Sequence, residues 1–220
     1  MSEPTQTTPF EKAALQKQQA GKPTTLPALL REDAYKKRFE AVLGARAPQF
    51  ISSILSLGAS KLRDVEPTSV VAAAMIAASL DLPIDPNLGF AWVVPYEKNG
   101  RKLGQFQMGY KGIIQLAQRT GAYAGMNAEA VNAEVYKGRS PIGEPIINWE
   151  AWDEEKPIAG YVFAFAMING FQKVCYWSKE RVERHAKRYS QAYRSKKGSP
   201  WEDNFDRMAI KTVVANELRR

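Results

Sequence analysis

Cations alternate with flat aromatic rings between residues 92 and 119, and this mixture suits the binding of single-stranded nucleic acid. Cationic side chains can follow the phosphates of a strand while aromatic rings stack on its bases. An ordinary amphipathic hairpin, with rings facing a core and cations facing water, explains the same residues and is favoured on spacing alone. The residues that we expect to contact DNA here are Trp92, Tyr96, Lys98, Arg101, Lys102, Gln105, Gln107, Tyr110, Lys111 and Arg119.

Two further groups of cations lie nearer the C-terminal end of the sequence. Arg207 and Lys211 are four residues apart, so in a helix they share one face and could both bind phosphates. A plain surface pair explains this spacing equally well. Trp201 stands at the expected start of the same helix and could clamp it. A second expected helix, residues 179–190, is densely basic and forms a candidate second patch. Trp201, Arg184, Arg188, Arg207 and Lys211 are therefore added to the expected DNA-binding surface.

Residue types and motifs that would support catalysis are scarce. The sequence has neither a phosphate-binding P-loop nor a dinucleotide-binding glycine motif between a strand and a helix. The single histidine, His185, has no second histidine or cysteine pair with which to share a metal, and we expect it to face solvent or DNA. Cys175 lies within an expected strand and is interpreted as a buried, inert thiol. We expect no catalytic residue, no metal and no cofactor, and so a protein that is not an enzyme.

An acidic cluster provides the alternative of a metal-dependent nuclease. Asp153 and Glu154 followed by Lys156 superficially match the two carboxylates and the lysine of such enzymes. Pro157 follows immediately, however, and the run is typical of a turn between strands. A solvated acidic loop is therefore the preferred interpretation. A protein that stores single-stranded DNA without annealing it is the other alternative.

The charge of the chain favours a polyanionic partner. The chain has 31 Lys and Arg against 23 Asp and Glu, a net charge of +8, and residues 90–220 carry +7 of it. No apolar run has the roughly 20 residues that a membrane-spanning helix requires, so we expect no membrane contact. The single cysteine suits a reducing compartment. We expect a soluble, cytoplasmic protein.

The pattern of apolar residues predicts helices first and strands later. Residues 1–28 are polar and predict a flexible arm, with a short helix over residues 10–19. Helices are expected over residues 31–43, from Pro48 and from Pro67, since proline is tolerated in a first helical turn. Two hairpins are expected at Asn99-Gly100 and Asn169-Gly170, with strands over 126–136 and 146–149 between them. Helices are also expected over 110–120, after the cap residue Ser178, and over 201–220, with a loop over 194–199 before the last one.

This order predicts an α+β fold in which helices pack on a small antiparallel sheet containing two hairpins. We expect a single domain over residues 29–220. Its helical part, residues 29–80, would supply or support subunit contacts through Tyr35, Phe39 and Phe50, or would simply complete the core. Its DNA-binding part would be residues 81–220. The last helix reaches the final residue without a stop signal, so we expect that a C-terminal extension is missing.

Three blocks of the sequence resemble the RecT family of phage and prophage annealing proteins. The blocks run from Leu80 through Tyr96, from Gln107 to Gly121, and from Pro200 to Thr212. They contain the Gly-Tyr-Lys-Gly segment at residues 109–112 and the Met-Ala pair at 208–209. They follow one another in the family order, and the region that they span, about residues 80–220, is roughly two-thirds of the chain.

The resemblance implies ATP-independent binding of single-stranded DNA and annealing of complementary strands in recombination and repair. It also implies a ring or helical filament, a basic groove similar to that of the lambda Red beta protein, and contact with both single strands and the annealed duplex. Lys111, Arg207 and Lys211 would bind phosphates in that groove, and the hairpin from Trp92 to Gln107 would form a base-contacting wall. The sequence departs from the family at Asn216, where a basic residue is frequent. The missing C-terminal extension would contact a phage exonuclease and the host single-strand-binding protein.

Overall fold

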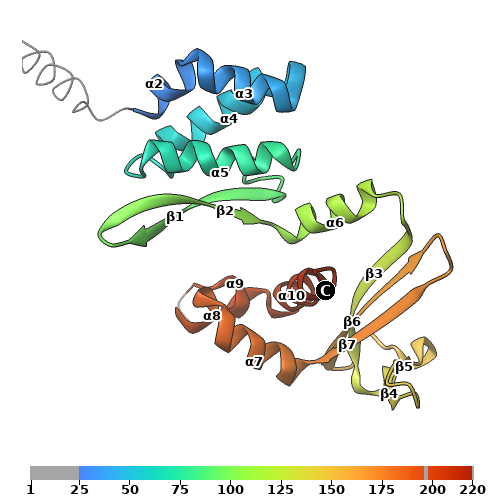
Figure 1. The fold of residues 1–220 in the computed structure, drawn as a ribbon. Coiled ribbons are helices and arrows are strands. Elements are labelled where there is room, and N and C mark those ends of the chain that lie inside the picture. The colour runs from blue at the N-terminus through green and yellow to red at the C-terminus, as the bar shows by residue number, and fades with distance from the viewer. Residues whose placement is uncertain (1–24, 196–197, 220) are drawn as a thin grey trace, which may run out of the picture. The chain divides into compact units, whose positions relative to one another are not determined.

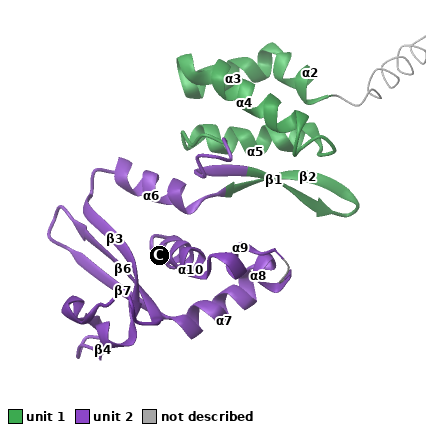
Figure 2. Ribbon diagram, turned by 180° about the vertical axis from the view of Figure 1, so that it is seen from behind, with its two compact units in different colours: residues 1–84, 93–107 green, residues 85–92, 108–220 purple. Residues whose placement is uncertain are grey.

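The computed structural model describes residues 25–195 and 198–219, and the chain divides into two compact units. The first unit contains residues 1–84 and 93–107, and the second contains residues 85–92 and 108–220 (Figure 2). The helix expected over residues 10–19 lies outside the described residues. No helix of the described chain is long and apolar enough to cross a membrane.

The first unit consists of helices and a β-hairpin (Figure 1). Its helices begin where the sequence supplies starting signals: the Thr25 side chain accepts a hydrogen bond from the Ala28 amide, and Pro48 and Pro67 lie in the first turns of their helices. The elements are α2 (Leu26–Arg31), α3 (Asp33–Leu43), the 3-10 helix η1 (Gly44–Arg46), α4 (Ala47–Ala59), α5 (Pro67–Ser79), β1 (Ala91–Lys98) and β2 (Arg101–Met108).

Two of the three aromatic residues that we considered as subunit anchors pack against each other in this unit, one buried and one half-buried. Phe39 is fully buried, and its ring lies 5.8 Å from the ring of Phe50. The burial of Phe39 favours the alternative that this ring completes the core, while Phe50 is half-buried and Tyr35 lines an open groove between α3 and α5. Leu26 is buried in α2, so this helix includes the end of the stretch that we expected to be a flexible arm.

The β1–β2 hairpin turns at Asn99-Gly100, as its sequence predicts. Both residues have positive φ angles, 54° and 72°, which asparagine and glycine adopt most readily. The hairpin packs on α5 through Gly104, where a Cβ atom would lie 3.0 Å from the backbone of Val70. The Glu66 amide also donates a hydrogen bond of 2.9 Å to the Lys102 carbonyl oxygen. These contacts place residues 93–107 with the helices, whereas the sequence placed them with the DNA-binding part.

The second unit is built on a three-stranded antiparallel sheet in the order β3–β6–β7. The β6–β7 hairpin turns at Asn169-Gly170 as predicted, and a separate ribbon pairs β4 with β5. The elements are α6 (Tyr110–Arg119), β3 (Tyr123–Asn132), η2 (Ala133–Val135), β4 (Tyr136–Arg139), β5 (Pro145–Ile147), η3 (Trp149–Ala151), β6 (Ile158–Met167), β7 (Gln172–Ser178), α7 (Lys179–Tyr189), α8 (Gln191–Ser195), α9 (Pro200–Asp203) and α10 (Phe205–Glu217).

Helices α6, α7 and α10 bury the core of this unit. Tyr161 and Trp177 on the sheet pack with Val182 of α7 and Val213 of α10. Helix α10 contacts α6, α7, β3 and β6, so it is the central helix of the unit. The mixture of helices with small antiparallel sheets confirms the expected α+β class.

The C-terminal region differs from the single helix expected over residues 201–220. Asn204 has φ −144° and ψ 54°, outside the helical region, and this residue separates α9 from α10. The Ser199 side chain caps α9 by accepting a hydrogen bond from the Trp201 amide. Residues 191–195 form α8, so part of the loop expected from Arg194 is helical.

Candidate nucleic-acid interface

Helix α10 carries two of the expected phosphate ligands, Arg207 and Lys211. Arg207 is exposed, while Lys211 is half-buried. Burial is the only cause that lowers the pKa of Lys211 from its ordinary value, so no carboxylate offsets the loss of water around this amine. Within the described part of the chain neither side chain has an ion-pair partner.

Helix α6 packs against α10 within the second unit and carries the third expected ligand, Lys111. Gly112 and Ile113 bury one face of α6, and Lys111 remains exposed on another, as does Arg119 in the last turn. Tyr110 is half-buried against the core of the unit. The structure therefore brings the helices of Lys111, Arg207 and Lys211 together, although these residues are far apart in the sequence.

The segment before α6 is fixed by tight packing around two glycines. A Cβ atom on Gly109 would lie 2.2 Å from the Gly89 carbonyl oxygen and 2.6 Å from the ring of Trp92. The Gly109 amide donates a hydrogen bond of 2.9 Å to the Phe90 carbonyl oxygen. Trp92 is half-buried and packs against these glycines. This packing accounts for an aromatic residue at a position where the sequence suggested base stacking.

A buried hydrogen bond fixes α10 to the sheet. The fully buried Tyr161 hydroxyl on β6 donates a hydrogen bond of 2.5 Å to the Asp206 carboxylate at the start of α10. Burial, followed by this carboxylate, raises the pKa of Tyr161 well above its ordinary value, so the hydroxyl remains a donor. The bond positions the helical turn that carries Arg207.

Trp201 was expected on the DNA-binding surface, and the structure corrects this expectation. Its side chain is only 6% exposed, and its Nε1 donates a hydrogen bond of 3.1 Å to the Ser190 hydroxyl. Its ring packs edge-on against Tyr193 and Phe205, each with 5.4 Å between centroids. The ring clamps α9 and α10, as the sequence also suggested, and cannot stack on a base in this conformation.

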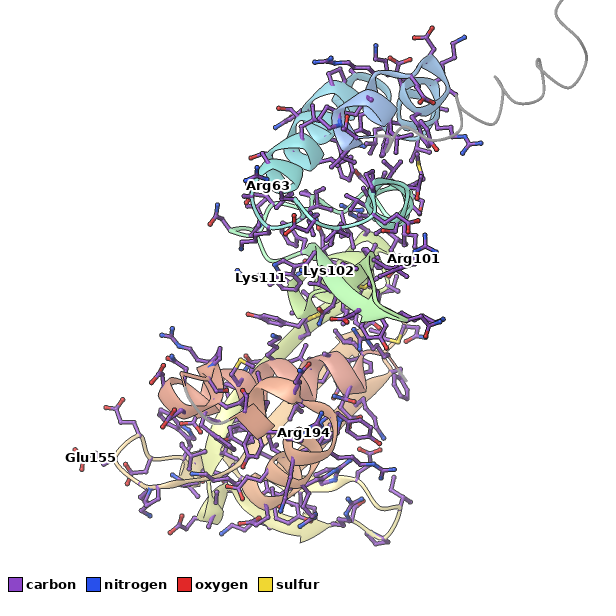
Figure 3. All side chains as sticks on the ribbon, turned by 90° about the vertical axis from the view of Figure 1, so that its left-hand side faces the viewer. Arg63, Arg101, Lys102, Lys111, Glu155 and Arg194 are labelled. Carbon is purple, nitrogen blue, oxygen red and sulfur yellow. The ribbon has the colours of Figure 1, made fainter. Side chains whose placement is uncertain are left out.

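The β1–β2 hairpin presents its expected DNA-binding residues on both faces. Side chains alternate along a strand, so Lys102 points to the opposite face from Arg101 and Gln105. Arg101 pairs with Glu66, whereas Gln105, Gln107, Tyr96 and Lys98 are exposed. Arg101 and Lys102 are labelled in Figure 3. One face alone therefore cannot present every residue of the expected wall.

Helix α7 is the basic helix that the sequence predicted. The Ser178 hydroxyl caps it by accepting a hydrogen bond from the Arg181 amide, as expected. Arg184 and Arg188 are exposed and one helical turn apart. Arg181 instead lies over the ring of Trp177, with 3.9 Å between its guanidinium carbon and the ring centroid.

His185 and Cys175 have structural surroundings. The His185 ring lies between Trp177 and Tyr189, with centroid distances of 5.4 and 4.7 Å. It is half-buried, whereas we expected it to face solvent or DNA. Burial lowers the pKa of His185, although a hydrogen bond with Asn216 opposes this shift. Burial and the Glu217 carboxylate raise the pKa of Cys175 to about 12, in agreement with an inert thiol.

The acidic run forms a loop that projects from the second unit, with Glu155 at its tip (Figure 3). Asp153 accepts a hydrogen bond from the Glu155 amide. Lys156 pairs at 3.4 Å with Glu134, which is not one of the two carboxylates that the nuclease hypothesis combined with this lysine. The described residues contain no group of three or more His, Cys, Asp or Glu side chains that could hold a metal ion. The loop lines an open hollow of about 670 Å³, here called the acidic hollow, with Glu134, Lys137, Glu150, Ala151, Trp152, Asp153, Glu154 and Lys156 around it.

Sequence reasoning missed several residues that organise this unit. Asp206 and Glu217 accept hydrogen bonds from buried Tyr161 and Trp177, the second at 2.7 Å. Acidic residues in an expected helix are usually interpreted as a solvated surface. The one sequence signal that could have indicated a buried role was the position of these acids beside the apolar residues of α10. The partners come from strands about 40 residues away, which spacing cannot reveal.

Known proteins resemble this chain over most of its length. The family model described as the RecT family matches residues 48–220. The uncharacterized protein YqaK of Bacillus subtilis is 46% identical over 199 residues, which cover 89% of this chain and 66% of YqaK. Protein RecT of Escherichia coli is 25% identical over 226 residues, which cover 94% of this chain and 81% of that protein. The chain therefore belongs to the RecT family.

Proposed function

We propose that this protein binds single-stranded DNA and anneals complementary strands in recombination, without ATP and as an oligomer. The observation that carries the proposal is the cation set of the second unit, in which Lys111, Arg207 and Lys211 lie on two helices that pack together. Membership of the RecT family supports the same activity.

Lys211 gives this proposal its physical basis. A half-buried amine without a carboxylate has lost part of its hydration and has gained no ion pair in return. A phosphate oxygen nearby would provide the missing counter-charge and a charge-assisted hydrogen bond. Arg207, four residues earlier on α10, would contact a neighbouring phosphate with a planar, bidentate guanidinium group.

Annealing requires no bond chemistry. Two strands repel each other until their phosphates are neutralised, and pairing can be tested only while the bases stay exposed. Cations that hold the backbone in a groove meet both requirements. On this proposal Arg119 adds a further cation at the end of α6, and the exposed hairpin residues of the first unit, Tyr96, Lys98, Gln105 and Gln107, are further candidate contacts with DNA.

Oligomerisation is part of the proposal, because one 24.6 kDa subunit can hold only a few nucleotides. A ring or filament would repeat the groove along a strand until enough base pairs form for a stable duplex. Binding of DNA and self-association would then be thermodynamically linked. We also propose an intracellular site of action, with a phage exonuclease and a host single-strand-binding protein as partners.

The test is a pairing assay with two complementary labelled strands, no nucleotide, and Mg²⁺ present or absent. An annealing protein accelerates duplex formation and leaves the length of both strands unchanged. A storage protein slows pairing relative to free strands, and a nuclease shortens them when Mg²⁺ is added. Either of these two results would overturn the proposed function.

A further inference from the structure

One residue that lines the acidic hollow, Trp152, has an exposed aromatic ring that the proposed DNA contacts do not use. Trp152 is 43% exposed, although its Nε1 donates a hydrogen bond of 3.1 Å to the Ala130 carbonyl oxygen. The hydrogen bond fixes the edge of the indole against β3 while part of the ring remains open to solvent. A large ring fixed in this way is preorganised for a partner, because little side-chain entropy is lost when something covers it.

The charges around Trp152 determine what can bind there. The four carboxylates that line the hollow outnumber its two lysines, Lys137 and Lys156, so its net negative charge would repel a phosphate backbone. The exposed indole is therefore not a platform for DNA bases. A cationic side chain is attracted both by the face of an indole and by carboxylates beside it. The chain already contains this combination, since Arg181 lies 3.9 Å over the ring of Trp177.

A complementary surface lies on the same unit. Arg184 and Arg188 are exposed one turn apart on α7, with exposed Lys187 beside them. Arg188 and Lys187 are in the last turn of the helix, where Arg194 also donates hydrogen bonds to their carbonyl oxygens, so cations gather at this end of α7. This half of α7 therefore presents a positive surface that is complementary in charge to the carboxylates of the acidic hollow.

We propose that the acidic hollow of one copy binds the Arg184–Arg188 face of α7 from a second copy of this chain. The two surfaces differ, so the contact is head-to-tail, and it can be repeated along a filament or closed into a ring. This inference deepens the proposed function by naming the surface through which copies associate. It reassigns Arg184 and Arg188 from DNA contacts to subunit contacts.

The experiment is a charge exchange in the full chain, with self-association measured by sedimentation velocity at low salt without DNA. Glu150→Lys with Glu154→Lys, and separately Arg184→Glu with Arg188→Glu, should each weaken self-association by roughly tenfold or more. The four substitutions together should restore it, since the charges are again complementary. Glu40→Lys with Glu202→Lys is the matched control, because it changes net charge by the same +4 at exposed acids elsewhere.

Each outcome decides the inference. Monomeric wild-type protein, unchanged association in the charge-reversed variants, or failure of the four-fold variant to regain association would overturn it. Binding of a short labelled single strand, measured by fluorescence anisotropy, provides the second measurement. If Arg184→Glu with Arg188→Glu abolishes that binding while self-association is intact, α7 is a DNA surface and the inference is wrong. Wild-type protein that self-associates as proposed but does not anneal would refute the proposed function and leave this contact standing.

Discussion

Replacing Lys211 by methionine should weaken DNA binding and stabilise the fold at the same time. The substitution removes the half-buried charge while keeping an unbranched apolar side chain in its place. Because burial lowers the pKa of Lys211, the protonated amine costs free energy in the folded protein. A lysine that serves only packing or an internal ion pair would give a less stable protein when replaced.

The loss of affinity follows from the number of phosphates contacted. Each cation that binds a single strand contributes about 0.7 to the slope of log K against log salt, which amounts to roughly fivefold in affinity at 0.1 M salt. Lys211→Met should therefore flatten the slope by about 0.7, and replacing Lys111, Arg207 and Lys211 together should flatten it by about 2. Fluorescence anisotropy of a labelled single strand over a salt series measures both quantities.

The effect of pH on stability has a defined sign. Between the lowered pKa of Lys211 and its ordinary value of 10.5, the unfolded chain binds more protons than the folded one. The wild-type free energy of unfolding should therefore rise with pH in that window relative to Lys211→Met, and the advantage of methionine should be complete below the lowered pKa. Urea unfolding at several pH values measures this difference.

Lys61→Met is the matched control for the binding measurement, since Lys61 is exposed and lies outside the proposed DNA surface. It removes the same charge and should leave the salt dependence of binding almost unchanged. An unaltered slope for Lys211→Met, or a loss of DNA binding that merely follows a loss of stability, would refute the assignment of Lys211 as a phosphate ligand.

Other substitutions test the framework that positions these cations. Tyr161→Phe removes the donor to half-buried Asp206 and should lower the free energy of unfolding by about 1–3 kcal/mol in urea titration, whereas equal stability would mean that the bond does not fix α10. Gly109→Ala should lower the free energy of unfolding more than Tyr161→Phe does, because the new Cβ would lie 2.2 Å from a backbone oxygen. Gly125→Ala serves as its control, since a Cβ atom at that position would meet open space. Cys175, with its pKa raised to about 12, should react with a thiol reagent at pH 8 only after unfolding, and rapid labelling of the folded protein would contradict its burial.

Local signals in the sequence predicted the elements well. Asn-Gly pairs predicted both hairpin turns: Asn99 and Gly100 both have positive φ angles, which few other residues adopt in succession, while in the second turn Gly170 alone has a positive φ angle. The first-turn prolines at residues 48 and 67 and the cap at Ser178 placed three helix starts. These features depend on backbone geometry over a few residues, which is the range that sequence reasoning can treat.

The features that were missed depend on contacts between distant segments. Whether Trp201 stacks on bases or packs internally depends on Tyr193 and Ser190, which only the fold brings to it. Placement of the hairpin with the helices depends on the approach of Gly104 to Val70. The break at Asn204 reflects packing on both sides of a residue with weak helix propensity.

The central claim is annealing, and the most direct measurement is the rate at which two complementary labelled strands pair when the protein is added without nucleotide. The account predicts pairing that is faster than for free strands, that depends on salt, and that slows when Lys111, Arg207 and Lys211 are replaced together. Pairing that is slowed by the wild-type protein, or that is equally fast with the triple variant, would contradict it.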